Sequence, residues 1–101
     1  MTTPTTPPRK RHTRPISTVG DLIDACRSPH TILDCFFRND NGRWYIPGEL
    51  SGRPTVEQLD GNRYLRGQTI TERKRFADYR TGVGWNLYID ARFDPEAYRR
   101  G

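Results

Sequence analysis

The chain has 101 residues, with 17 Lys and Arg against 12 Asp and Glu, and a formal net charge of +5. This length predicts one domain and argues against enzymes built from two domains around a cleft. No apolar run approaches the roughly 20 residues of a membrane span, and the first residues show no apolar signal-peptide region. We therefore expect a cytoplasmic protein with reduced thiols, or a nuclear one if the host is eukaryotic.

The N-terminal stretch MTTPTTPPRKRHTRPI is rich in Pro and Thr and carries only positive charges. Its basic residues are Arg9, Lys10, Arg11 and Arg14. The stretch predicts a disordered basic arm over residues 1–16, followed by one small domain over 17–101. Such an arm suits phosphate contacts, and a nuclear import signal or a merely solubilising terminus are the alternatives. The remaining 13 basic and 12 acidic residues nearly balance, which argues against a histone-like basic surface.

Residues 17–27 have the spacing of an amphipathic helix. Val19, Leu22, Ile23 and Cys26 fall at i, i+3, i+4 and i+7, which places them on one apolar face. Ser17 or Thr18 can cap its start.

Residues 28–42 fit two structures. Ser28 and Pro29 form a helix start, the apolar stripe at 32, 33, 36 and 37 favours a helix, and Gly42 can end it. The alternative is a strand, TILDCFF, joined through the turn NDNG to a short strand at 43–47. We favour the helix.

The second half of the chain predicts short helices and extended segments in alternation. We expect a short helix at 55–61, a short strand or extended segment at 62–67 and a helix at 69–84 that starts at a Thr69–Glu72 capping box. A strand is the alternative at 69–84. Residues 85–93 alternate apolar and polar side chains, which predicts the best strand, and a last short turn follows Asp94-Pro95.

These elements predict an α+β fold in a small single domain, with two short N-terminal helices packed on a small antiparallel sheet. The expected core residues share bulk and apolar spacing. They are Leu22, Ile23, Ile32, Leu33, Phe36, Trp44, Trp85, Leu87 and Ile89.

Two short helices followed by an extended segment suit a winged helix-turn-helix. The strings SPHTI and GRWYIP resemble excisionase-type domains, in which a second helix opens on Ser-Pro and a wing carries Arg-Trp-x-Ile-Pro. The resemblance spans about 30 of the 101 residues and implies DNA binding through residues 29–38. The segment between helix and wing is shorter here than in that family.

Arginine supplies 15 of the 17 basic residues, and its planar guanidinium suits phosphates and bases. Interleaved Arg and Tyr after residue 62 predict a nucleic-acid surface, against the alternative of a solvated charged face. The candidate contact residues in this region are Arg63, Arg66, Arg73, Lys74, Arg75 and Arg80. The basic residues of the arm complete the set.

The sequence contains only weak indications of metal binding or catalysis. Cys26, His30 and Cys35 resemble the last three ligands of a zinc knuckle, but a structural zinc site needs four ligands. His30 is the one histidine after the arm, and no P-loop or nucleophile elbow is present. We expect no metal, no cofactor and no enzymatic activity.

The sequence thus favours a non-enzymatic nucleic-acid-binding accessory or regulatory protein, of viral, phage or mobile-element origin. DNA or RNA is the expected partner, with neither a membrane nor a small-molecule substrate. The alternative is an adaptor or inhibitor that binds a protein partner or forms a homodimer through exposed aromatic and Arg residues.

Overall fold

The computed structural model describes residues 15–80 and 82–101, and it confirms the α+β fold class. The predicted arm lies outside these residues except for its last two. The elements in chain order are α2 (Val19–Ala25), β1 (Ile32–Arg38), β2 (Trp44–Tyr45), the 3-10 helix η2 (Gly48–Leu50), α3 (Val56–Leu59), α4 (Arg63–Arg66), β3 (Glu72–Asp78), β4 (Gly82–Tyr88) and α5 (Pro95–Arg100).

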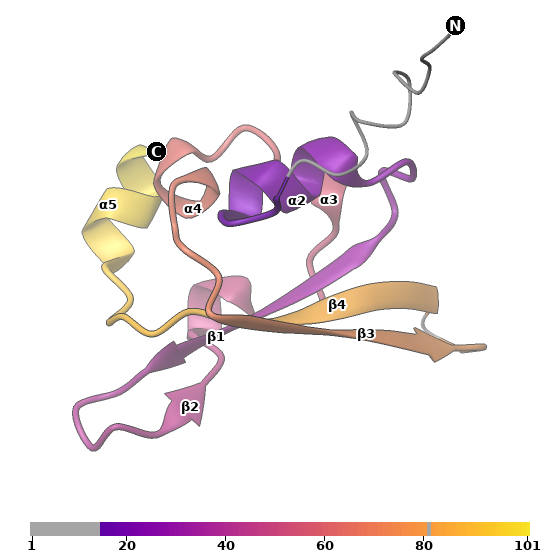
Figure 1. Cartoon of the computed structure of the whole chain (residues 1–101). Coiled ribbons are helices and arrows are strands. Elements are labelled where there is room, and N and C mark those ends of the chain that lie inside the picture. The colour runs from indigo at the N-terminus through magenta and orange to yellow at the C-terminus, as the bar shows by residue number, and fades with distance from the viewer. Residues whose placement is uncertain (1–14, 81) are drawn as a thin grey trace, which may run out of the picture.

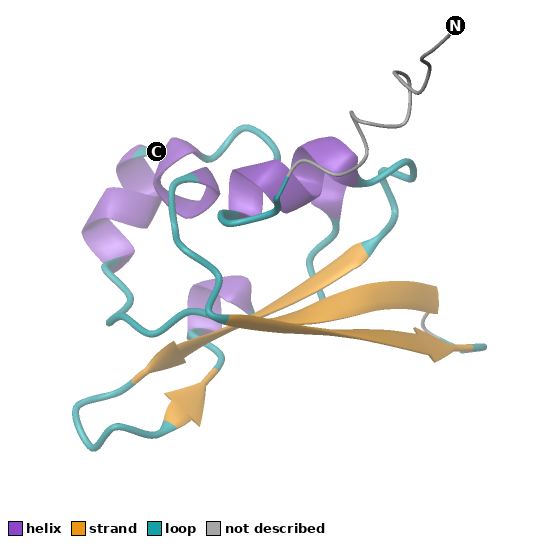
Figure 2. Cartoon of the chain, in the orientation of Figure 1, coloured by secondary structure: helices purple, strands orange, loops and turns teal. Residues whose placement is uncertain are grey.

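The four strands form one sheet in the order β2-β1-β4-β3. The central pair, β1 and β4, is parallel, while both outer pairs are antiparallel. The sheet is therefore mixed, and the prediction of an antiparallel sheet was wrong at its centre. The α-helices gather on one side of the sheet (Figure 1), and the opposite face carries none of them (Figure 2). The molecule is thus a two-layer structure with one open sheet face.

The helix predicted at 17–27 is confirmed as α2. Thr18 caps it, because its side chain accepts a hydrogen bond from the Asp21 amide while the Asp21 carboxylate accepts one from the Thr18 amide. Val19, Leu22 and Ile23 are buried against the sheet.

The helix predicted at 29–38 was wrong, because Ile32–Arg38 is the strand β1. It pairs with β4, and apolar residues lie on both of its faces. Leu33, Cys35 and Phe37 are fully buried on the helix-covered side, whereas Phe36 lies on the other face. The turn Asn39–Gly42 then leads into β2, with Gly42 at φ +74°. The alternative hairpin is therefore the observed structure, and the helix-turn-helix with its excisionase-type recognition helix is excluded.

The helix predicted at 69–84 was also wrong. The segment forms β3, a turn and the first part of β4, with Gly82 at φ +96°. The predicted strand at 85–93 is correct only as far as Tyr88. Across β3 and β4, seven residue pairs lie in register from Glu72–Tyr88 to Asp78–Gly82. Pairing with β4 along this whole length outweighs the local capping signal at Thr69.

Capping residues explain where the remaining short helices form. The short helix expected at 55–61 is α3, capped by Thr55 and Gln58, and Asp94-Pro95 starts α5. The extended segment expected at 62–67 is instead the helix α4, because the Asn62 side chain accepts a hydrogen bond from the Leu65 amide.

The core lies between the helices and the sheet. Of the predicted core residues, the aliphatic ones are buried, and Trp85 packs at the edge of the cluster. Trp44 is 37% exposed and Phe36 is half-buried on the open face, so their assignment to this core was wrong. Sequence reasoning missed Phe37, Leu50 and Leu65, which are fully buried. Within the described ranges, no helix has the length and apolar character needed to cross a bilayer.

Candidate nucleic-acid interface

A groove of about 460 Å³ lies between the end of α2 and the hairpin formed by β3 and β4. We call it the arginine groove. Arg27, Arg73 and Arg75 line it together with apolar side chains that include Leu22, Val83 and Trp85. Among the described residues, no Asp or Glu lines this groove.

The strand register explains why two of the arginines meet here. Arg73 lies opposite Leu87 and Arg75 lies opposite Trp85, so both share the sheet face that carries the core. However, β3 is an edge strand, and both side chains remain exposed. The guanidinium carbon of Arg73 lies 5.2 Å from the centre of a Trp85 ring, within the range of a cation–π contact.

The three groove arginines form no ion pair with any described residue. Within residues 15–80 and 82–101, Arg27, Arg73 and Arg75 have no carboxylate within 4.0 Å, whereas Arg38, Arg53, Arg66, Arg92 and Arg99 each pair with an acid. Three uncompensated positive charges therefore meet in one concave place, while the other described arginines without an ion pair, Arg43, Arg63, Arg80 and Arg100, lie outside the groove. Such a place attracts anions, because the positive charges add and the concave wall lowers the local dielectric.

Cys26 also lines the groove, and it brings no competing negative charge. Burial raises the pKa of its half-buried thiol above that of an ordinary cysteine, while a hydrogen bond with Thr31 partly offsets this. The thiol is therefore protonated at neutral pH.

The arm enters beside this groove, because Ile16 is one of its lining residues. Arg9, Lys10, Arg11 and Arg14 lie outside the described residues, so the structure gives them no position. Sequence places Arg14 two residues before Ile16. Of the predicted arm, the structure thus places only the C-terminal end, at Ile16, beside the groove that holds Arg73 and Arg75.

The other predicted contact residues lie elsewhere. Arg66 bridges α2 and α4, with Nη2 2.9 Å from Asp24 Oδ1 and Nη1 2.7 Å from Asp60 Oδ1. These acids, Asp24 above all, raise the pKa of Arg66, so its charge is compensated. Arg63 lies on α4 in a shallow depression that Asp21 and Asp24 also line. We conclude that α4 does not extend the basic surface.

The end of the hairpin and the far face of β3 hold the last two predicted residues. Arg80 follows Tyr79, which is 95% exposed, and its guanidinium carbon lies 5.8 Å from the Tyr79 ring. Lys74 points to the open sheet face, because it alternates with Arg73 and Arg75 along β3. The structure therefore brings Arg73 and Arg75 together and separates Lys74, Arg80 and the α4 residues from them.

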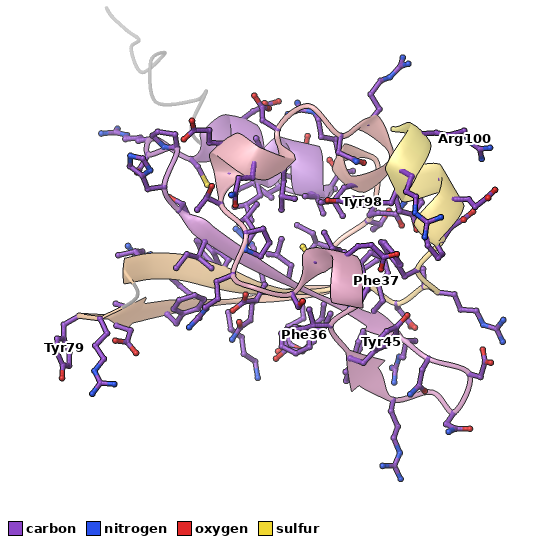
Figure 3. The ribbon with its side chains drawn as sticks, turned by 180° about the vertical axis from the view of Figure 1, so that it is seen from behind. Phe36, Phe37, Tyr45, Tyr79, Tyr98 and Arg100 are labelled. Atoms are coloured by element: carbon purple, nitrogen blue, oxygen red, sulfur yellow. The ribbon has the colours of Figure 1, made fainter. Side chains whose placement is uncertain are left out.

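The second notable surface is the open aromatic face, which we define by Phe36, Trp44, Phe76 and Tyr88. Phe36 and Tyr88 stack with ring centres 4.9 Å apart, and Trp44 meets Tyr88 edge-on at 5.3 Å. Figure 3 shows Phe36 on the opposite side of the sheet from Phe37 and the helices. Among the described residues, no α-helix lies on this side of the sheet (Figure 1).

The cations of the open aromatic face are compensated. Arg38 Nε lies 3.1 Å from Asp90 Oδ1, Arg53 Nη2 lies 3.0 Å from Asp34 Oδ2, and Lys74 Nζ lies 3.7 Å from Glu72 Oε2. Arg38 and Arg53 also lie over the rings of Trp44 and Phe76 at 4.0 and 5.0 Å. This face is rich in aromatic area but close to neutral, which distinguishes it from the arginine groove.

Sequence reasoning missed Arg27 as a site residue and treated Trp85 as core alone. No local signal identifies Arg27, because a single Arg before Ser-Pro is common in a polar turn. Trp85 occupies an inward position of the predicted strand, and its role in the groove depends on the edge of the sheet being uncovered.

The described residues contain no group of three or more His, Cys, Asp or Glu side chains that could hold a metal ion. Cys26 and Cys35 are free thiols, and His30 is exposed in the turn before β1. Comparison with family models, curated proteins and solved structures gives no match. The interpretation of the groove therefore rests on its own geometry and charge.

Proposed function

We propose that the protein is a non-enzymatic nucleic-acid-binding accessory protein and that the arginine groove is its contact surface. One observation carries the proposal. Arg27, Arg73 and Arg75 converge without an acid partner on a groove that holds Trp85, and the basic arm joins the domain at that groove. Guanidinium groups bind phosphates, and aromatic rings stack on bases, so the two together match a nucleotide.

The test is binding of labelled single-stranded DNA, single-stranded RNA and duplex DNA, measured by fluorescence anisotropy in about 0.15 M salt. The critical variant is the full chain with Arg73→Glu and Arg75→Glu. We expect it to lose about tenfold or more in affinity for whichever nucleic acid the protein binds, because two phosphate contacts become repulsions.

A matched control uses Arg43→Glu and Arg100→Glu. Both residues are exposed, neither lines the groove, and Arg100 lies on α5 at the other end of the molecule from Tyr79 (Figure 3). Each double variant falls in net charge from +5 to +1, because every Arg→Glu change removes two charges. Equal loss in both variants would show that net charge, rather than the groove, governs binding.

Cys26 offers a second readout of location. A bound oligonucleotide should slow maleimide labelling of Cys26, which lines the groove, while buried Cys35 stays unlabelled in the folded protein. Burial raises the pKa of Cys35 to about 12, so its thiolate is scarce as well as inaccessible. Labelling of Cys26 at an unchanged rate in the complex would place the ligand elsewhere.

A second candidate function, association with a protein partner, is favoured by the open aromatic face. Exposed Trp44 and half-buried Tyr88 lie beside arginines, which resembles the composition of protein interfaces. The paired charges of this face give it no particular affinity for phosphate. The binding series distinguishes the two functions. Under the second function, no nucleic acid binds at about physiological salt, and reversing Arg73 and Arg75 changes nothing.

A further inference from the structure

We infer that the arginine groove receives an unpaired base, so that the ligand is single-stranded nucleic acid rather than duplex. This inference rests on the proposed function and specifies its ligand. It comes from the apolar residues of the groove, which phosphate binding alone does not require.

The groove brings together apolar surface, which suits a base, and cationic side chains, which suit a phosphate. Val83 and Trp85 provide apolar and aromatic surface, and Arg27, Arg73 and Arg75 line the same groove. Val83 is 41% exposed, so hydrophobic surface at the outer end of the groove faces solvent in the free protein. Covering this apolar surface with a base is favourable because it removes the surface from water. A bound phosphate would leave the same surface hydrated.

The contact between Arg73 and Trp85 shows how a nucleotide could be held. The guanidinium carbon lies over the ring, 5.2 Å from its centre, so a base that stacks on this ring shares or replaces the contact with Arg73. A base stacked on the indole would carry its own phosphate toward Arg73 or Arg75. Arg75 lies directly opposite Trp85 in the strand pair, which places a second cation at the same level of the sheet.

A duplex does not offer what this groove recognises. Its bases expose only their edges, and proteins read those edges with a helix or ribbon that protrudes into a groove of the DNA. Arg27, Arg73 and Arg75 instead line a hollow between α2 and the hairpin. Single strands can turn an unstacked base into such a hollow.

The test uses the full chain with Trp44→Phe, which leaves Trp85 as the one tryptophan. The probes are oligo(dT), oligo(U), an abasic strand of the same length and a duplex of the same length. We expect oligo(dT) or oligo(U) to quench Trp85 fluorescence, and we expect the abasic strand to bind about fivefold or more weakly than oligo(dT) despite its equal charge. The duplex should bind more weakly than either intact single strand.

Substitutions at Trp85 give an independent check. Trp85→Phe keeps an aromatic face and should retain most of the preference for intact over abasic strands, while Trp85→Leu should remove it. Because Trp85 also packs against the core, thermal melts must show that each variant is folded at the assay temperature. The abasic comparison needs no change at Trp85, so it decides the question even if both variants fail to fold.

The outcomes separate the two proposals. If abasic and intact strands bind equally without quenching, yet Arg73→Glu with Arg75→Glu still weakens binding, the groove binds phosphates only and this inference is wrong. A preference for the duplex would overturn it as well. If no nucleic acid binds, the proposed function itself is wrong, and the inference falls with it.

Discussion

At the scale of single residues, Gly84 controls how closely two central strands approach. It lies opposite Ile32 on β1 and Phe76 on β3. A Cβ atom at this position would meet the Ile32 carbonyl oxygen and would lie 2.5 Å from Cζ of Phe76. The ring of Phe76 therefore occupies the space that a side chain would need, on the open aromatic face.

We predict that Gly84→Ala destabilises the domain by about 1–3 kcal/mol, because backbone atoms of β1 cannot move away without loosening the parallel pair. Gly61→Ala is the matched control, since a Cβ there meets nothing within 4 Å. Chemical denaturation followed by circular dichroism measures both. Equal stability of the two variants would mean that β1 and β4 pair less tightly than described.

At the scale of elements, α2 and α4 are joined by charge as well as by packing. Arg66 on α4 reaches Asp24 on α2 and Asp60 at the end of α3. The close approach is helped by Gly20, whose absent Cβ would lie 3.0 Å from the Arg66 carbonyl oxygen. Arg66 therefore has a structural explanation that does not need a nucleic-acid partner.

We predict that Arg66→Gln lowers stability by about 1 kcal/mol or less, because Asp24 and Asp60 are more than half exposed and water screens both pairs. Its effect on oligonucleotide affinity should be no greater than that of losing one distant charge. A melt and an anisotropy titration on the same sample test both expectations. A large loss of affinity in a fully folded Arg66→Gln protein would show that α4 is part of the binding surface.

The edge strand β3 is an element with two roles. Its exposed backbone could pair with another chain, and charged side chains at such an edge oppose that pairing. Arg73, Lys74 and Arg75 supply those charges. Alternation along the strand then sends two of them to the arginine groove and one to the open aromatic face, so one run of three basic residues serves two surfaces.

At the scale of the whole molecule, the arm and the groove each hold a group of basic residues. The arm holds four basic residues, and the groove holds three arginines without an acid partner among the described residues. Ile16 belongs to the groove wall, so truncating the chain after it would damage the site. Neutralising the arm in the full-length chain is the cleaner experiment.

We predict that changing Arg9, Lys10, Arg11 and Arg14 to Gln makes the salt dependence of binding shallower. For a single strand, the slope of log K against log salt should fall in magnitude by up to about 3, because each released counterion contributes about 0.7. Anisotropy titrations across a salt series measure this slope. An unchanged slope would show that the arm does not contact phosphate.

The sequence by itself determined the elements whose signals are local. Thr18 and Asp21 cap α2, Thr55 and Gln58 cap α3, and Asp94-Pro95 starts α5. A helix satisfies its hydrogen bonds within one short segment, so nearby residues suffice to specify it. The α+β class and most of the aliphatic core follow from the same local patterns.

Only the tertiary structure decided the segments around 28–42 and 69–84, where helical and strand periods both fitted. Leu33 becomes part of a strand because Trp85, far along the chain, lies opposite it in the parallel pair. The arginine groove likewise depends on long-range pairing, since Arg27 follows the end of α2 and Arg73 lies on β3, which pairs with β4 at the sheet edge. A strand's hydrogen bonds lie on other strands, so neither its formation nor the surface it builds can be read from its own residues.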